Sequence, residues 1–228
     1  MMFIAFIKCF AHAFLFHRYT FMASTSTKYD FKLYDIDRRA PNADLKIALR
    51  LGYVGRSSLN SVAELYCGKT GSVFATNTNQ VVMVDKSTRK PTTIPDWWKD
   101  KHGPLVQDGK ALVVSLVDVP SVTHTYDVKV PWTDIDRYKH TNYVSYIRYC
   151  QNAALDACYA DKFSRVKGDF LDQRIESMSV CYKGECVAND LLTVHVWESP
   201  DNPFKIHFSI HKNDAVIFQN TVTLFKPL

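Results

Sequence analysis

The chain has 228 residues, enough for one large domain or two domains of ordinary size. Its apolar fraction of 46% and charged fraction of 22% exclude a disordered or fibrous protein and are typical of a folded globular one. The formal net charge is +5, but Lys and Arg are spread along the sequence, which argues against a nucleic-acid-binding arm.

The first segment, residues 1–29, is rich in Phe and Ala and has no acidic residue before Asp30. Its apolar stretch is too short, and too often interrupted by Lys and His, to predict a membrane span. Three interpretations stay open: a weak secretory signal, an organelle transit peptide, or a misplaced translation start ahead of Met22. The last two are favoured, and with them a cytoplasmic or mitochondrial location.

The next segment, 30–118, has the pattern of β-structure. Strands are predicted at 46–55, 57–67 and 72–86, where apolar and polar residues alternate. Pro91 and Pro95 then interrupt the pattern, and residues 111–130 are strand-prone again. This segment is therefore predicted to be a first, partial sheet-forming unit.

The third segment, 119–228, combines one helix with four strands. Residues from Asn142 to about Tyr159 carry a stripe of apolar and small side chains at helical spacing, and Asn142 is placed to cap the helix. Strands are predicted at 174–184, 190–199, 204–213 and 215–226, separated by turns. One helix with antiparallel strands predicts an α+β unit in which a sheet wraps a central helix.

Two similarities within the chain suggest an internal repeat. Residues 46–67 resemble 176–197 in their strand–Gly–strand layout, and YDFKLYDIDRR (29–39) is similar to YDVKVPWTDIDRY (126–138). The first copy has no helix to match 142–159, unless residues 2–19 supply one.

The six cysteines form no CxxC pair and no Cys/His spacing for zinc. We expect reduced, half-buried thiols in an intracellular protein, and no structural metal. They are Cys9, Cys67, Cys150, Cys158, Cys181 and Cys186.

The stretch VPWTDIDRYKHTNYVSYIRYCQNAA (130–154), within the segment from Val128 to Ala157, resembles the loop-and-helix signature of hotdog-fold thioesterases. The similarity is to the branch of 4-hydroxybenzoyl-coenzyme A thioesterases and plant acyl-carrier-protein (acyl-ACP) thioesterases. It implies an α+β hotdog fold, arranged as a tandem or double hotdog. It also implies an acyl thioesterase that acts on acyl-CoA or acyl-ACP without a metal or organic cofactor.

The resemblance also implies roles for individual residues. Asp136 would be the general base or nucleophile, and His140 would orient water or substrate. Backbone N–H groups near Asn142 and Tyr143 would polarise the thioester carbonyl. In addition to these catalytic residues, Asp134, Tyr143, Tyr146 and Asn152 are expected to bind the substrate.

Simpler interpretations of these residues stay open. Asp136 could be a turn former, His140 a solvated residue before the helix, and Asn142 only a cap. The sequence also departs from the family pattern at three positions: Tyr138 replaces an Asn, Lys139 a Gly, and Asn152 a Glu. The alternative function is therefore a catalytically inactive hotdog module for acyl binding or dimerisation.

Hotdog units of this superfamily work in pairs, so the resemblance implies a homodimer or a pair formed within the chain. A mildly positive surface would suit a phosphate-bearing carrier such as coenzyme A. Neither a nucleic-acid partner nor a stable membrane span is expected.

Overall fold

The structure is a computed structural model that describes residues 18–36, 44–106 and 109–226. These residues form two compact units: 18–25 with 44–113 (apart from 107 and 108), and 26–36 with 114–226. Among the described residues, no helix is both long and apolar enough to cross a membrane. The prediction that residues 2–19 form a helix falls largely outside the described residues.

The first unit is an antiparallel sheet with one short helix. Strand β1 (Arg18–Tyr29) begins in this unit, and its neighbours are β2 (Leu45–Val54), β3 (Ser58–Cys67) and β4 (Val73–Asp85), in the order β2-β3-β4-β1. Helix α2 (Asp96–His102) and a 3-10 turn, η2 (Gly103–Leu105), follow the sheet. Trp98 of α2 is buried and packs with Leu51, Met83 and Ile94.

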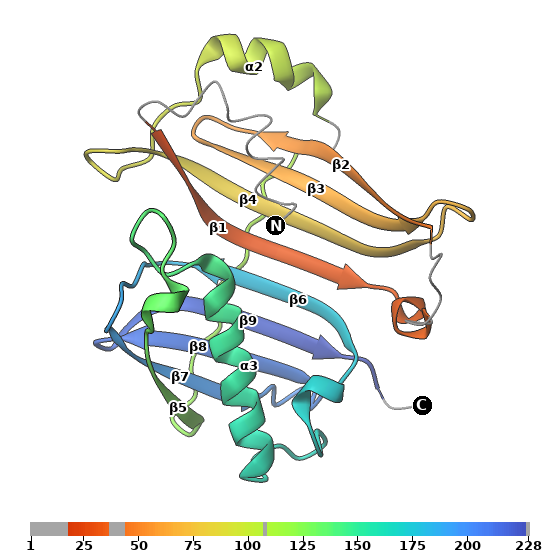
Figure 1. Ribbon diagram of the computed structural model, residues 1–228, viewed down its shortest axis with the longest axis vertical. Helices are drawn as coiled ribbons and strands as arrows, with labels where there is room; N and C mark the ends of the chain where they lie inside the picture. Colours follow the sequence, from red (N-terminus) through yellow and green to blue (C-terminus); the bar gives the residue numbers. More distant parts are fainter. Residues whose placement is uncertain (1–17, 37–43, 107–108, 227–228) are drawn as a thin grey trace. The chain divides into compact units, whose positions relative to one another are not determined.

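The second unit wraps five strands around one long helix. Its strand order is β6-β9-β8-β7-β5, and every neighbouring pair is antiparallel. Helix α3 runs across one face of this sheet (Figure 1). The elements are η1 (Phe31–Asp35), β5 (His124–Lys129), η3 (Trp132–Asp134), α3 (Tyr143–Tyr159), η4 (Phe170–Asp172), β6 (Ile175–Tyr182), β7 (Leu191–Glu198), β8 (Lys205–Lys212) and β9 (Ala215–Leu224).

Helix α3 packs on the sheet through small side chains. Ala153, Ala154 and Ala157 are fully buried, and with no side chain beyond Cβ they allow the helix to approach the sheet closely. Alternate residues of the strands point toward it, among them Val194 on β7 and Phe208 on β8. The helix, its cap and its apolar face are thus as the sequence predicts.

The two units share a strand order, but not along the predicted repeat. The order β1-β4-β3-β2 in the first unit matches β6-β9-β8-β7 in the second, so β2 and β3 correspond to β7 and β8. The sequence similarity instead aligned β2 and β3 with β6 and β7, which are not neighbours. The alignment was wrong because apolar–polar alternation recurs in many sheet strands and does not distinguish one of them from another.

Two further expectations need correction. Arg18–Tyr29 lies within the segment 1–29, which was separated from the first sheet-forming unit, yet it forms β1 of that sheet. The strand-prone stretch 111–130 forms a strand only at His124–Lys129. Ahead of it, the backbone of Val117 is held by the side-chain amide of Gln219, with two hydrogen bonds of 2.8 Å, rather than by a neighbouring strand.

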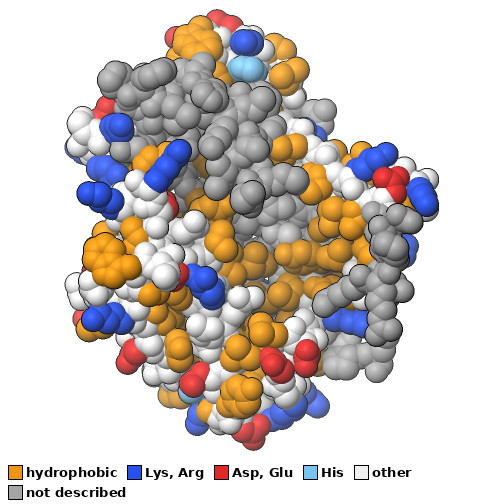
Figure 2. All heavy atoms as spheres, viewed as in Figure 1, with side chains coloured by type: hydrophobic (Ala, Val, Ile, Leu, Met, Phe, Trp, Pro, Cys, Tyr) orange, Lys and Arg blue, Asp and Glu red, His pale blue; other side chains and the backbone are white. Residues whose placement is uncertain are grey.

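Charged side chains are mixed over the surface. Figure 2 shows Lys and Arg interspersed with Asp and Glu over the described part of the visible face, without a single basic field there. This agrees with the even spread of charge along the sequence.

A group of histidines lies on the sheet face opposite α3. The rings of His195 and His211 are 4.6 Å apart, and His195 Nδ1 lies 2.9 Å from the hydroxyl of Thr123. His207 stacks on Trp197. Burial lowers the pKa of all three histidines, and the charge of His195 further lowers that of His211.

These lowered pKa values predict acid sensitivity. Because the folded-state pKa lies below the unfolded value of about 6.5, the unfolded chain binds more protons at acidic pH. The contribution of these histidines to the free energy of unfolding should therefore be complete above about pH 6.5. It should decrease as the pH falls below that value. Urea unfolding at pH 7.5, 6.5 and 5.5 measures this, and the double variant His195→Gln/His211→Gln should show a smaller decrease. An equal decrease in that variant would contradict the assignment.

Candidate functional site

The loop between β5 and α3 is a small closed hairpin. Val130 at its start is hydrogen-bonded to Asn189 and Asp190, which lie in the turn before β7. An isolated bridge pairs Ile135 with Thr141, and the N–H of Asp136 donates to the carbonyl of His140 over 2.8 Å. The loop is therefore held by its own hydrogen bonds and by the turn beside it.

Asp136 stabilises this hairpin with one carboxylate oxygen. Oδ1 accepts the N–H of Tyr138 at 2.8 Å and that of His140 at 3.3 Å. No other hydrogen bond to the carboxylate is present within the described residues, so Oδ2 has no donor there. Asp136 is thus a turn former, and it also keeps a second oxygen available to water.

His140 faces a carboxylate from another segment. Its Nε2 lies 3.5 Å from Oε2 of Glu185, and both side chains are partly exposed. Glu185 follows β6, in a turn whose neighbour Cys186 is hydrogen-bonded to Thr141. Glu185 could not be predicted from the sequence, because nothing local in KGEC (183–186) distinguishes a site carboxylate from a solvated one.

Asn142 caps α3 as predicted. Its Oδ1 accepts the N–H of Val144 at 3.0 Å, and its own N–H donates to the carbonyl of Asp134 at 2.8 Å. The N–H of Tyr143, at the first helical position, has no acceptor among the described residues. That donor, at the positive end of the helix, can bind an electron-rich oxygen.

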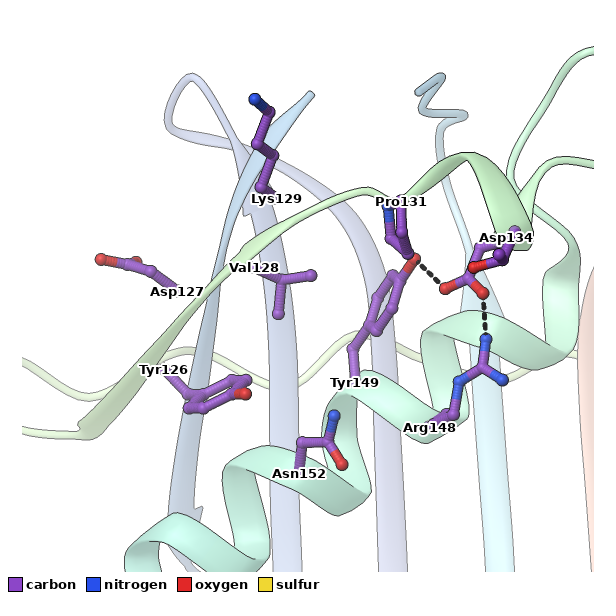
Figure 3. A pocket seen from close by; sticks show the side chains of 10 residues that line it. Tyr126, Asp127, Val128, Lys129, Pro131, Asp134, Arg148, Tyr149 and Asn152 are labelled. Atoms are coloured by element: carbon purple, nitrogen blue, oxygen red, sulfur yellow. Dashed lines mark hydrogen bonds and ion pairs between the residues drawn. The ribbon is translucent and has the colours of Figure 1, made fainter. Parts of the chain in front are cut away.

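The side chain of Asp134, whose carbonyl accepts the N–H of Asn142, binds two side chains of α3. Its carboxylate is buried, forms an ion pair with Arg148, and accepts the hydroxyl of Tyr149 at 2.6 Å (Figure 3). Burial and the neighbouring Asp134 raise the pKa of Tyr149, which keeps the hydroxyl protonated as a donor. Asp134 therefore ties the loop to α3.

A shallow cleft of about 410 Å³ lies between β5 and α3. Asp134 and Arg148 line one end of it, and the exposed amide of Asn152 lies one helical turn further along (Figure 3). Asn152 thus shares a surface with Asp134, but it is not among the residues that meet at the start of the helix.

The two predicted tyrosines differ in burial. Tyr143 is partly buried, and its carbonyl accepts the hydroxyl of Tyr182 at 3.1 Å. Tyr146 is buried, stacks on Phe218 and accepts the N–H of Cys186 at 3.1 Å. Burial is the main cause of the raised pKa of Tyr146, so its hydroxyl stays protonated. Direct substrate contact by either side chain stays a prediction.

The whole structure is similar to two solved acyl-ACP thioesterases. With the 12:0-ACP thioesterase from Umbellularia californica the TM-score is 0.68 at 16% identity, over 91% of this chain and 75% of the other. With an acyl-ACP thioesterase from Bacteroides thetaiotaomicron VPI-5482 it is 0.63 at 14% identity, over 91% and 77%. The chain has the hotdog fold. At this identity the similarity establishes the fold only.

No protein-family model matches the sequence, and no curated protein sequence is similar to it. The hotdog fold nevertheless agrees with the resemblance seen in residues 130–154. It places the hairpin, the start of α3 and the turn after β6 together in the second unit.

The hairpin of this hotdog unit carries local backbone strain. Lys139 has a φ of 64°, in the left-handed region, at the position where the family pattern has Gly. Lys139→Gly should raise the free energy of unfolding by roughly 1 kcal/mol, because Gly adopts this conformation without a Cβ penalty. Urea unfolding measures the change. Arg137→Gly is the control, because Arg137 lies in the same hairpin at an ordinary φ, and this variant should not raise the free energy of unfolding. An equal increase in both variants would contradict the assignment of backbone strain to Lys139.

Proposed function

We propose that the chain is a thioesterase that hydrolyses acyl-ACP or acyl-CoA thioesters. The observation that carries the proposal is the contact of His140 with Glu185 in the hairpin that leads into α3, where two further groups are available. His140 faces Glu185 at 3.5 Å, the Asp136 carboxylate lies in the same hairpin, and the N–H of Tyr143 is available. The fold shared with two acyl-ACP thioesterases supports this assignment.

The three groups suit the steps of thioester hydrolysis. Asp136 would take a proton from water as the water oxygen bonds to the carbonyl carbon, or would attack that carbon itself. The carbonyl oxygen becomes negative, and the N–H of Tyr143 would donate to it at the positive end of α3. When water attacks, the C–S bond breaks to give the carboxylic acid, and the carrier's thiolate takes up the proton that Asp136 had accepted. When Asp136 attacks, the C–S bond breaks to give a mixed anhydride with Asp136; water then hydrolyses the anhydride, which releases the acid, restores the Asp136 carboxylate and supplies the proton for the thiolate.

His140 would orient the attacking water and the thioester. An imidazole next to a carboxylate is held in one orientation, because the carboxylate accepts a hydrogen bond from the ring N–H. Glu185 would hold the ring of His140 in this way.

The test is hydrolysis of a panel of acyl-CoA and acyl-ACP thioesters of different chain lengths by the wild type and by Asp136→Asn. We expect turnover of at least one substrate by the wild type and a loss of about 100-fold or more in the variant. Wild-type turnover that Asp136→Asn leaves unchanged would refute the site assignment.

Lack of turnover on every substrate would refute the proposed activity. It would favour the alternative, a catalytically inactive acyl-binding or dimerisation module. The exposed amide of Asn152, at a position where the family pattern has a Glu, favours that alternative, because an amide cannot act as a general base.

A further inference from the structure

The turn that carries Glu185 is fixed through its neighbour, Cys186. The carbonyl of Cys186 accepts both the N–H of Thr141 at 2.8 Å and its hydroxyl at 3.0 Å. The N–H of Cys186 donates to the hydroxyl of Tyr146 at 3.1 Å. Both backbone groups of Cys186 are thus bound to the hairpin and to α3, which also carry the proposed catalytic groups.

The thiol of Cys186 is not the functional part of this arrangement. It is fully buried, and its Sγ lies 3.1 Å from the hydroxyl of Thr141 and 3.2 Å from that of Tyr146. Burial raises the pKa of Cys186, so the thiol stays protonated and is a poor nucleophile. The backbone of Cys186 matters instead, because its hydrogen bonds fix the position of the adjacent residue, Glu185.

Tyr146 is itself rigid. Its ring stacks on Phe218 with centroids 5.3 Å apart and contacts Tyr182 edge-on at 6.1 Å. The ring is packed in a cluster with these two aromatic neighbours, which restricts where its hydroxyl can lie in the first turn of α3. A hydrogen bond to such a group restricts the turn more than one to a mobile surface side chain does.

We propose that Tyr146 is a positioning residue, whose hydroxyl holds the backbone of Cys186 so that Glu185 stays against His140. This inference rests on the proposed thioesterase function. It gives Tyr146 a role that acts through Glu185 rather than through contact with the acyl group.

The test is a double-mutant cycle of Tyr146→Phe and Glu185→Gln on thioester hydrolysis. Phe keeps the stacking on Phe218 and removes only the hydroxyl. We expect Tyr146→Phe to lower kcat by about 10- to 100-fold with KM changed less than threefold, since a misplaced group costs turnover. In the Glu185→Gln background the same change should lower kcat less than twofold. Equal effects in both backgrounds would refute the proposal.

Tyr34→Phe is the matched control. The hydroxyl of Tyr34 is also bound to a backbone in the second unit, at 2.7 and 2.8 Å from Ile175, but in no contact with the turn. The Tyr34→Phe variant should be less stable than the wild type but should have an unchanged kcat. A loss of kcat in Tyr34→Phe equal to that in Tyr146→Phe would mean that general destabilisation explains both.

A second measurement does not depend on activity. Tyr146→Phe should speed hydrogen exchange at the Cys186 amide at least tenfold, whereas Tyr34→Phe should not. If the wild type hydrolyses no thioester, the proposed function fails and this exchange alone judges the positioning. Unchanged exchange in Tyr146→Phe would refute the positioning role whether or not the chain is an active enzyme.

Discussion

His140→Gln is expected to lower kcat/KM for acyl thioester hydrolysis by about 100- to 10,000-fold, the range over which a positioned imidazole contributes. The physical reason is the pairing of Nε2 with Glu185 at 3.5 Å beside the start of α3. Gln keeps a polar side chain of similar reach but has no ring to orient water against the thioester carbonyl. Steady-state kinetics on the best substrate of the acyl panel measures the loss.

A second histidine of the same unit provides the control. His124 Nε2 lies 2.7 Å from Oδ2 of Asp156, which is near the other end of α3. His124→Gln therefore removes an imidazole that faces a carboxylate, as His140→Gln does, but away from the hairpin. We expect kcat/KM within twofold of the wild type. If both variants lose activity equally, His140 has no special role, and its contact with Glu185 is as structural as that of His124 with Asp156.

Most of the second unit could be predicted from sequence because its elements have regular patterns. The helix from 143 to 159 is recognisable from its small-residue stripe and the Asn142 cap, and β6–β9 are recognisable as strand-prone runs separated by turns. These features depend on neighbours within a few residues along the chain. They therefore needed no knowledge of the tertiary structure.

Strand β1 could not be predicted in this way because its buried side chains are polar. Ser24 and Thr25 are buried. The hydroxyl of Ser24 donates to the carbonyl of Leu112 at 2.9 Å, and that of Thr25 donates to the side-chain oxygen of Asn79 at 2.7 Å. Burial of hydroxyls gives no apolar alternation, and the Ser/Thr cluster instead has the composition of a leader segment. Only partners far along the sequence make such a strand stable.

The site shows the same division. The side-chain hydrogen bonds of Asp136 and Asn142 reach residues two to four positions away, so a turn and a cap could be predicted directly. Glu185 meets His140 only after β6 and the hairpin have come together. Likewise, no local pattern indicates that Arg148 and Tyr149 would bind the carboxylate of Asp134.

The burial of Asp134 leads to a second large effect, on stability. Asp134→Ala should lower the free energy of unfolding by about 2–3 kcal/mol, measured by urea unfolding. The Arg148 side chain is 54% exposed, so its ion pair with Asp134 contributes little of this. The main loss comes from the buried hydroxyl of Tyr149, which is left without its acceptor at 2.6 Å.

The double variant Asp134→Ala/Tyr149→Phe separates these contributions. Removing donor and acceptor together leaves no unsatisfied group, so the double variant should be at least about 1 kcal/mol more stable than the sum of the single losses predicts. Asp127→Ala removes an exposed carboxylate that accepts the hydroxyl of Thr193, and should change stability by less than about 0.5 kcal/mol. Simple additivity in the double variant would show that Asp134 stabilises the loop through Arg148 instead. The stability that Asp134 gives the hairpin would then decrease with salt concentration, because salt screens a half-exposed ion pair but not a buried hydrogen bond.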